Sequence, residues 1–207
     1  MMEPIRILVV EDDPDFQYLI QQSLSEHSDF ALIACCQDGE SAFLAAVREQ
    51  PDVVLMDLAL PTDPVEGVMA ARRIRLETRA KVILLTSYEE PETVVRASVE
   101  ALASAYVLKS QFPLLVPTIR ETARGVTPQS HLICSALLKN LTPAEISVFR
   151  YMLGTPVTLH SSEKTIANQQ TSVLHKLGLQ NKQQLRHVFA AYFPQIAEAT
   201  GQFYQKR

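Results

Sequence analysis

Short apolar runs alternate with amphipathic stretches along the first 124 residues of the chain. The apolar runs, which are typical of buried parallel strands, cover residues 5–10, about 30–35, 52–57, 81–86 and 105–108. Helical periodicity occupies the stretches between and after them, at about 14–27, 40–49, 66–78, 91–103 and 112–124. Five strand–helix units of this length predict a three-layer α/β domain built on a parallel sheet.

The pattern changes after residue 124. Residues 125–140 have the composition of a partly helical linker, and beyond them only helical periodicity is found. We therefore predict a first domain over 1–124, a linker over 125–140 and a smaller all-α domain over 141–207.

Capping signals divide the all-α part into three predicted helices. Thr142 and Glu145 have the spacing of a capping box, so the first helix begins there. Ser162 opens a second helix, and Gly178 has the place of its C-terminal cap. Asn181 opens the third.

Composition narrows the classes of protein to consider. The chain of 207 residues is 47% hydrophobic, which is ample for the cores of two small domains. No apolar run approaches the length of a membrane span, and acidic residues follow the N-terminus too soon for a signal peptide. We therefore expect a cytoplasmic protein with no membrane partner. The three cysteines have neither metal-ligand spacing nor an even number, which predicts buried free thiols.

Charge is distributed unevenly between the two parts of the chain. Residues 1–140 carry 12 Lys and Arg against 20 Asp and Glu, whereas residues 141–207 carry seven against three. Such asymmetry suggests an acidic module joined to one that meets a polyanion. A modestly basic surface that binds nothing is the plainer interpretation.

Polar side chains stand where four of the predicted strands end. They are Glu11-Asp12-Asp13 after the first strand, Asp57 at the end of the third, Thr86 at the end of the fourth and Lys109 after the fifth. In a doubly wound sheet the carboxyl ends of the strands share one edge, where ligands bind. The sequence therefore predicts a small cleft that combines carboxylates, a hydroxyl and one ammonium group.

Each of these residues also has an interpretation without a site. Asp12 and Asp13 are well suited to cap the helix that begins near Pro14, because aspartate is favoured at that position. Lys109 can be a solvated strand end. Taken together, these interpretations require four coincidences at one edge of the sheet, so we favour a shared site.

The four motifs resemble, in this order, the receiver domain of two-component response regulators. They are Glu11-Asp12-Asp13, Leu55-Met56-Asp57, Leu84-Leu85-Thr86-Ser87 and Val107-Leu108-Lys109. The resemblance covers about the first 124 residues. It implies a flavodoxin-like (βα)5 fold and, as partner, a sensor histidine kinase or another phosphodonor. An ordinary metabolic enzyme on this fold is disfavoured because the sequence has no Gly-rich phosphate loop.

The resemblance implies a magnesium site beside the phosphoacceptor. Mg²⁺ prefers oxygen ligands and keeps several waters, so a few carboxylates suffice. We expect Asp13 and Asp57 to be direct ligands and Asp12 to act through water. The backbone carbonyl of Ala59 matches the position that supplies a further ligand in the family.

The resemblance also assigns roles in phosphoryl transfer. Asp57 would attack phosphorus as a carboxylate nucleophile, and Lys109 would pair with the transferred group. Thr86 would donate its hydroxyl to the same oxygens. Thr86 and Tyr106 match a hydroxyl and an aromatic residue that move together on phosphorylation, although Tyr106 as a partly buried core residue is an equally good interpretation.

The three C-terminal helices resemble the LuxR-type helix-turn-helix output domain. The resemblance covers about residues 141–193, but the stretch 155–161 is about five residues too short to hold the helix that braces the reading helix in the family. The reading helix, at 162–177, also lacks basic residues at some expected places. The candidates for DNA contact are Lys164, Asn168, Gln170, Thr171, Lys176 and Lys182, with Arg186 as a further phosphate contact.

Two functions of different classes follow. The first is a phosphorylation-switched transcription regulator that binds DNA as a homodimer. The second is a receiver whose degenerate output domain has become a protein-interaction or dimerisation module. The sequence identifies neither the stimulus nor the cognate kinase nor the target genes.

Overall fold

The computed structural model describes residues 3–60 and 65–193. The end of the predicted output domain, 194–207, lies outside this range. By internal contacts the chain divides into two compact units, residues 1–133 and 134–207, and each is described by itself.

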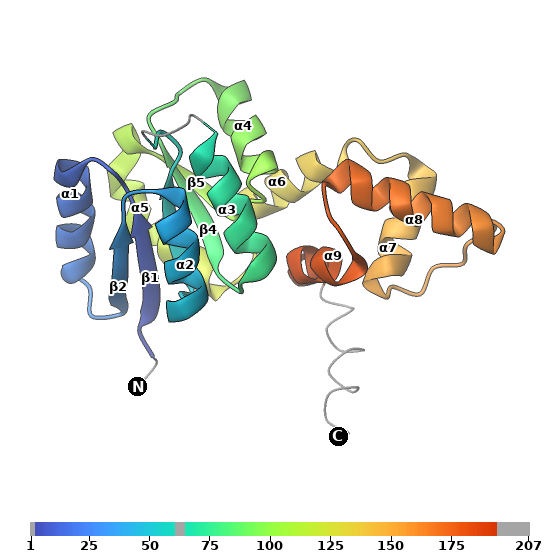
Figure 1. Ribbon diagram of the computed structural model, residues 1–207, viewed down its shortest axis with the longest axis horizontal. Coiled ribbons are helices and arrows are strands. Elements are labelled where there is room, and N and C mark those ends of the chain that lie inside the picture. The colour runs from blue at the N-terminus through green and yellow to red at the C-terminus, as the bar shows by residue number, and fades with distance from the viewer. Residues whose placement is uncertain (1–2, 61–64, 194–207) are drawn as a thin grey trace. The chain divides into compact units, whose positions relative to one another are not determined.

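A five-stranded parallel sheet forms the centre of the first unit, with strand order β2-β1-β3-β4-β5 (Figure 1). The strands are β1 (Ile5–Val10), β2 (Phe30–Cys36), β3 (Val53–Asp57), β4 (Lys81–Thr86) and β5 (Ala105–Leu108). Between and after them run α1 (Pro14–Ser25), α2 (Gly39–Glu49), α3 (Glu66–Glu77), α4 (Pro91–Glu100), the 3₁₀ helix η1 (Lys109–Leu114) and α5 (Leu115–Arg124). The predicted three-layer α/β fold is confirmed.

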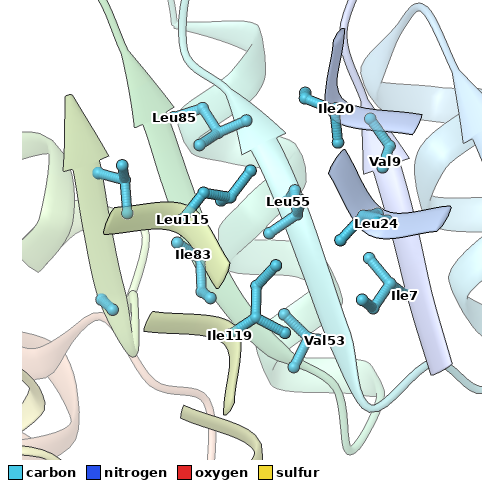
Figure 2. Close-up of a cluster of buried hydrophobic side chains, with 12 residues drawn as sticks. Ile7, Val9, Ile20, Leu24, Val53, Leu55, Ile83, Leu85, Leu115 and Ile119 are labelled. Atoms are coloured by element: carbon cyan, nitrogen blue, oxygen red, sulfur yellow. The ribbon is translucent and has the colours of Figure 1, made fainter. Parts of the chain in front are cut away.

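Helices cover both faces of this sheet. On one face, Ile20 and Leu24 of α1 and Leu115 and Ile119 of α5 pack on alternate residues of the strands (Figure 2). These strand residues are buried and apolar, and include Ile7, Val9, Val53, Leu55, Ile83, Leu85, Ala105 and Val107. The intervening residues of β1, β3 and β4, such as Leu8, Val54 and Leu84, are equally buried, under α2, α3 and α4 on the other face (Figure 1). Burial on both faces explains why the central strands β1, β3 and β4 are continuous apolar runs.

The last helix of the first unit begins differently from the prediction. The sequence predicts one helix over about 112–124, whereas the chain forms η1 first and α5 only from Leu115. Pro113 lies within η1 and has no backbone N–H to donate, which disfavours an earlier α-helical start. At its other end, α5 is closed by Lys81, whose Nζ donates to the carbonyls of Thr122 and Ala123.

In the described part of the chain after α5, four α-helices follow: α6 (Pro128–Leu138), α7 (Pro143–Leu153), α8 (Glu163–Leu177) and α9 (Lys182–Phe189), with a 3₁₀ turn η2 (Ala190–Tyr192). The boundary between the two units falls inside α6. The core of the second unit is centred on Phe149 and Phe189, which are fully buried with ring centroids 5.1 Å apart. Within the described residues, the stretch 155–161 contains no helix.

The thiols are only partly as expected. Cys134 is buried, but Cys35 is exposed, so the prediction of buried thiols was wrong for Cys35. Among the described residues, no helix is long and apolar enough to cross a membrane.

Candidate functional site

Three strand ends bring two carboxylates and one ammonium group into contact. Lys109 Nζ lies 2.9 Å from Asp57 Oδ2 and 2.8 Å from Glu11 Oε2. The side chain of Glu11 is fully buried and that of Asp57 is 2% exposed. The phenyl ring of Phe16 lies on another side of the ammonium group, with its centroid 4.5 Å from Nζ. Parallel pairing of β1, β3, β4 and β5 produces this convergence, because all four carboxyl ends share one edge.

The site contains two buried carboxyl groups, Glu11 and Asp57, but one ammonium group. Burial, reinforced by the charge of Asp57, raises the pKa of Glu11 from its usual 4.5 to about 7, although Lys109 opposes the shift. Burial alone would lower the pKa of Lys109, but its hydrogen bonds to Glu11 and Asp57 outweigh that effect and raise it. Two carboxylates therefore share one cation, and the site attracts further positive charge.

Carboxylate oxygens of Glu11, Asp12 and Asp57 lie within 4.8 Å of one another. This spacing and chemistry suit a divalent cation with oxygen ligands. Ala59, two residues beyond Asp57, donates its N–H to Asp57 Oδ1 at 3.0 Å, which fixes the orientation of that carboxylate.

Asp13, predicted from the sequence to be a direct ligand, is not among these three clustered carboxylates. Its carboxylate caps α1, where Oδ1 accepts the N–H groups of Asp15 at 2.9 Å and Phe16 at 3.4 Å. The structure thus shows Asp13 as the N-cap of α1, which is the capping role that the sequence left open. The sequence placed Glu11 at this edge of the sheet but did not assign it a role in the site. Its position directly after Val10, the last buried residue of β1, was the available signal.

A glycine allows α3 to begin against the end of β3. A Cβ atom on Gly67 would lie 2.4 Å from the carbonyl oxygen of Asp57 and 3.0 Å from the Cα of Leu58. The first distance is too short for a Cβ atom against backbone and the second is tighter than ordinary contact, so glycine permits an approach that a side chain would push apart. The backbone that carries Asp57 is thus held between β1, β4 and the first turn of α3.

Thr86 and Tyr106 occupy neighbouring strands beside this group. Asp57 pairs with Leu85 in the sheet, so Thr86 lies one step further toward the polar edge. Its side chain is buried, and Oγ1 accepts the N–H of Tyr88 at 2.9 Å. Tyr106 is half-buried on β5 and pairs with Leu84.

The candidate DNA contacts in the second unit have unequal surroundings. Lys164, Asn168 and Thr171 are exposed on α8, Gln170 is partly buried there, and Lys182 is exposed at the start of α9. The hydroxyl of Thr171 donates to the carbonyl of Ala167. Lys176 is held by Glu145, at 2.7 Å from Oε2, and Arg186 donates from Nε to the carbonyl of Met152.

Comparison with known proteins decides the family. The response regulator receiver domain family matches residues 7–119, which is more than half of the chain. The chain belongs to the response regulator receiver family. The matched residues include Glu11, Asp57 and Lys109, the three members of the ion-paired group.

Relatives and solved structures extend this assignment. The response regulator protein VraR of Staphylococcus aureus (strain NCTC 8325 / PS 47) is 32% identical over 123 residues, which is 58% of this chain and 57% of VraR. The chain thus spans little more than half the length of that relative. A LuxR-family two-component response regulator from Aurantimonas sp. SI85-9A1 is 28% identical, with a TM-score of 0.55, over 66% of this chain and all of that one.

A third match covers both units. RcsB from Salmonella enterica serovar Typhimurium, solved bound to promoter rprA with a phosphomimetic, is 22% identical with a TM-score of 0.53. The match covers 91% of this chain and 99% of RcsB, and at this identity it establishes the fold alone. The fold is therefore a flavodoxin-like receiver followed by a helical region like that of full-length LuxR-type regulators, as the sequence predicted.

Proposed function

We propose that this response regulator accepts a phosphoryl group on Asp57 and thereby controls DNA binding by its second unit. The observation that carries the proposal is the contact of Lys109 with Asp57 and Glu11 at one buried strand edge. A sensor histidine kinase or another phosphodonor would supply the phosphoryl group. The homodimer expected from the sequence stays a prediction.

Glu11, Asp12 and Asp57 would hold Mg²⁺, with the carbonyl of Ala59 as a further ligand. The raised pKa of Glu11 supports this assignment, because a second cation would relieve the repulsion between the two buried carboxylates. When bound, the metal supplies positive charge that offsets the approach of an anionic donor.

Asp57 would then attack phosphorus through a carboxylate oxygen. The new O–P bond forms as the bond from phosphorus to the donor's leaving group breaks, and the leaving group takes up a proton. The hydrogen bond that Lys109 donates to Asp57 supports a role in which its ammonium group would pair with the transferred oxygens. Thr86 and Tyr106 would carry the change outward. The Thr86 hydroxyl, whose oxygen accepts the N–H of Tyr88, would turn to donate to the phosphoryl oxygens.

The phosphoacceptor test uses acetyl phosphate, Mg²⁺ and intact-protein mass spectrometry. Wild type should gain the mass of one phosphoryl group, and Asp57→Asn should gain none. Modification of Asp57→Asn to the same extent would refute the assignment.

The metal ligands are tested by Mg²⁺ titration of the same protein. Asp12→Asn should weaken Mg²⁺ binding by about tenfold or more, since loss of one carboxylate ligand removes a charge from the site. Asp13→Asn is the matched control, because it removes a neighbouring charge but keeps a side chain that can cap α1. Equal loss in both variants would return Asp13 to the ligand set.

DNA binding by the second unit is supported by its net positive charge and by the exposed Lys164 and Asn168 on α8. The test is a mobility shift on the protein's own promoter DNA, with and without phosphorylation, at several salt concentrations. Binding strengthened by phosphorylation is expected. No binding in either state would favour the interaction module instead.

A further inference from the structure

A side chain from α6 occupies the open edge of β5. The N–H of Tyr106 donates to Gln129 Oε1 at 3.1 Å, and Gln129 Nε2 donates to the carbonyl of Tyr106 at 3.2 Å. β5 is the last strand of the sheet, so these two backbone groups face away from β4. The carboxamide of one glutamine thus supplies the acceptor and the donor that a sixth strand would have supplied.

Gln129 is held in place by the start of its own helix. The N–H of Thr127 donates to Ser130 Oγ at 2.8 Å, and the N–H of Ser130 donates to Thr127 Oγ1 at 3.1 Å. Both residues are buried, at 7% and 3% exposed. This reciprocal cap flanks Gln129 on both sides and restricts the backbone from which its side chain extends.

We propose that Gln129 acts as a latch: its two hydrogen bonds to Tyr106 hold the start of α6 against the edge of the sheet and couple movement of β5 to the second unit. The boundary between the two units lies inside α6, so a change at the start of this helix is passed along one continuous hydrogen-bonded element. The inference rests on the proposed function, in which Tyr106 responds to phosphorylation of Asp57.

The position of Tyr106 in β5 makes its hydrogen bonds to Gln129 sensitive to movement of the strand. Its neighbours Ala105 and Val107 are buried in the core, at 1% and 4% exposed, and tie the strand to the sheet. Only the backbone of Tyr106 is bound to Gln129, and both hydrogen bonds depend on its orientation. A shift of Tyr106 must therefore either break both bonds or move Gln129 with it.

The resting latch is tested by amide hydrogen exchange on the full chain without Mg²⁺ or phosphodonor. Gln129→Ala should speed exchange of the Tyr106 amide by about tenfold or more, because its acceptor is removed, and should speed exchange at the start of α6. Gln183→Ala, which removes an exposed glutamine from α9, is the matched control and should change neither. Unchanged exchange at Tyr106 in Gln129→Ala would overturn the latch.

The coupling is tested by adding Mg²⁺ and beryllium fluoride, a mimic of the phosphoryl group. In wild type, exchange should change near Asp57, at Tyr106 and along residues 129–138. In Gln129→Ala the change near Asp57 should persist while the change in 129–138 is lost. If the change in exchange along 129–138 is equally large in wild type and Gln129→Ala, the proposed coupling through Gln129 is wrong. No response near Asp57 in wild type would instead contradict the proposed function, and the resting experiment would still decide the latch.

Discussion

Three consecutive acids follow β1, and each has a different environment. Glu11 is fully buried against Lys109, Asp12 is partly exposed beside it, and Asp13 caps α1. The sequence predicted that acids from β1 reach the site, because they follow a buried strand. It did not predict which of them, since a one-residue shift in where the strand ends turns each carboxylate in another direction.

Glu11 should make the metal-free protein sensitive to pH. Between 4.5 and about 7 the folded state holds a proton on Glu11 that the unfolded state has lost, so the free energy of unfolding falls as pH rises through this window. Glu11→Gln should remove that fall. In urea unfolding at pH 8 with a chelator, the variant should be more stable than wild type by roughly 1 to 3 kcal/mol, since each tenfold change in proton affinity corresponds to about 1.4 kcal/mol.

At pH 4.5 the same comparison serves as the internal control. Glu11 is then protonated in the folded protein and resembles glutamine, so the two proteins should differ little. The gain at pH 8 should come with weaker Mg²⁺ binding. If the difference in free energy of unfolding between Glu11→Gln and wild type is the same at pH 8 as at pH 4.5, the ionised form of Glu11 does not destabilise the folded protein.

Gly67 should tolerate no side chain. Gly67→Ala would place a methyl group 2.4 Å from the carbonyl oxygen of Asp57, so α3 or the end of β3 must move. Alanine in a helix interior normally stabilises the folded protein by about 1 kcal/mol relative to glycine. Overpacking destabilises it by roughly 1 to 3 kcal/mol, and this effect should dominate here. We expect lower stability in urea unfolding and slower phosphorylation by acetyl phosphate.

Gly125→Ala is the matched control for this prediction. A Cβ atom on Gly125 meets nothing within 4 Å, and its φ of 166° is extended backbone. This variant should unfold like wild type or slightly later. Equal effects of the two substitutions would mean that the close approach at Gly67 is unimportant.

At the scale of elements, a buried carboxylate joins α7 to α8. Glu145 is 6% exposed and accepts from Ser172 Oγ and Lys176 Nζ, both at 2.7 Å, and from the N–H of Thr142 at 2.8 Å. The hydrogen bonds from Lys176, then Ser172 and Thr142, lower the pKa of Glu145 to about 2. This network fixes the register between the two helices in a unit where the stretch 155–161 is not helical.

Lys176 and Lys182 should therefore differ in their effect on DNA binding. Lys182 is exposed at the start of α9, and Lys182→Gln should reduce the slope of log affinity against log salt by about 1, as expected for one lost phosphate contact. Lys176→Gln should leave that slope nearly unchanged and instead lower the free energy of unfolding, because it removes the cation from Glu145. Mobility shifts at several salt concentrations and urea unfolding separate the two effects. If Lys176→Gln lowers the slope of log affinity against log salt by a full unit, Lys176 does contact a phosphate.

Element by element, the sequence predicted most of the architecture. The apolar runs mark the central strands because β1, β3 and β4 are buried on both faces. Caps such as Asn181 mark helix starts because their side chains satisfy backbone N–H groups. The contacts of Lys176 and Gln129 were not predictable in the same way. On a helix, each looks like a solvated polar residue, and its partner lies on an element distant in sequence.

The whole molecule consists of two units with separate cores and opposite charge balance. Binding of Mg²⁺ with beryllium fluoride should accordingly stabilise the first unit against unfolding but not the helices α7 and α9, because a ligand stabilises the structure that holds its site, by about 2.7 kcal/mol at a hundred times its dissociation constant. Hydrogen exchange during partial urea unfolding should show later opening of β1, β3 and β4 and unchanged opening of α7 and α9. Equal stabilisation of both would show that the units unfold as one.

Gln129, which covers the edge of β5, also determines where an isolated receiver fragment should end. A fragment that ends at residue 124 would lack Gln129 and would leave the N–H and carbonyl of Tyr106 open to other molecules. Open strand edges pair with their like, so such a fragment should self-associate and aggregate on concentration, whereas one that continues through residue 133 should stay monodisperse.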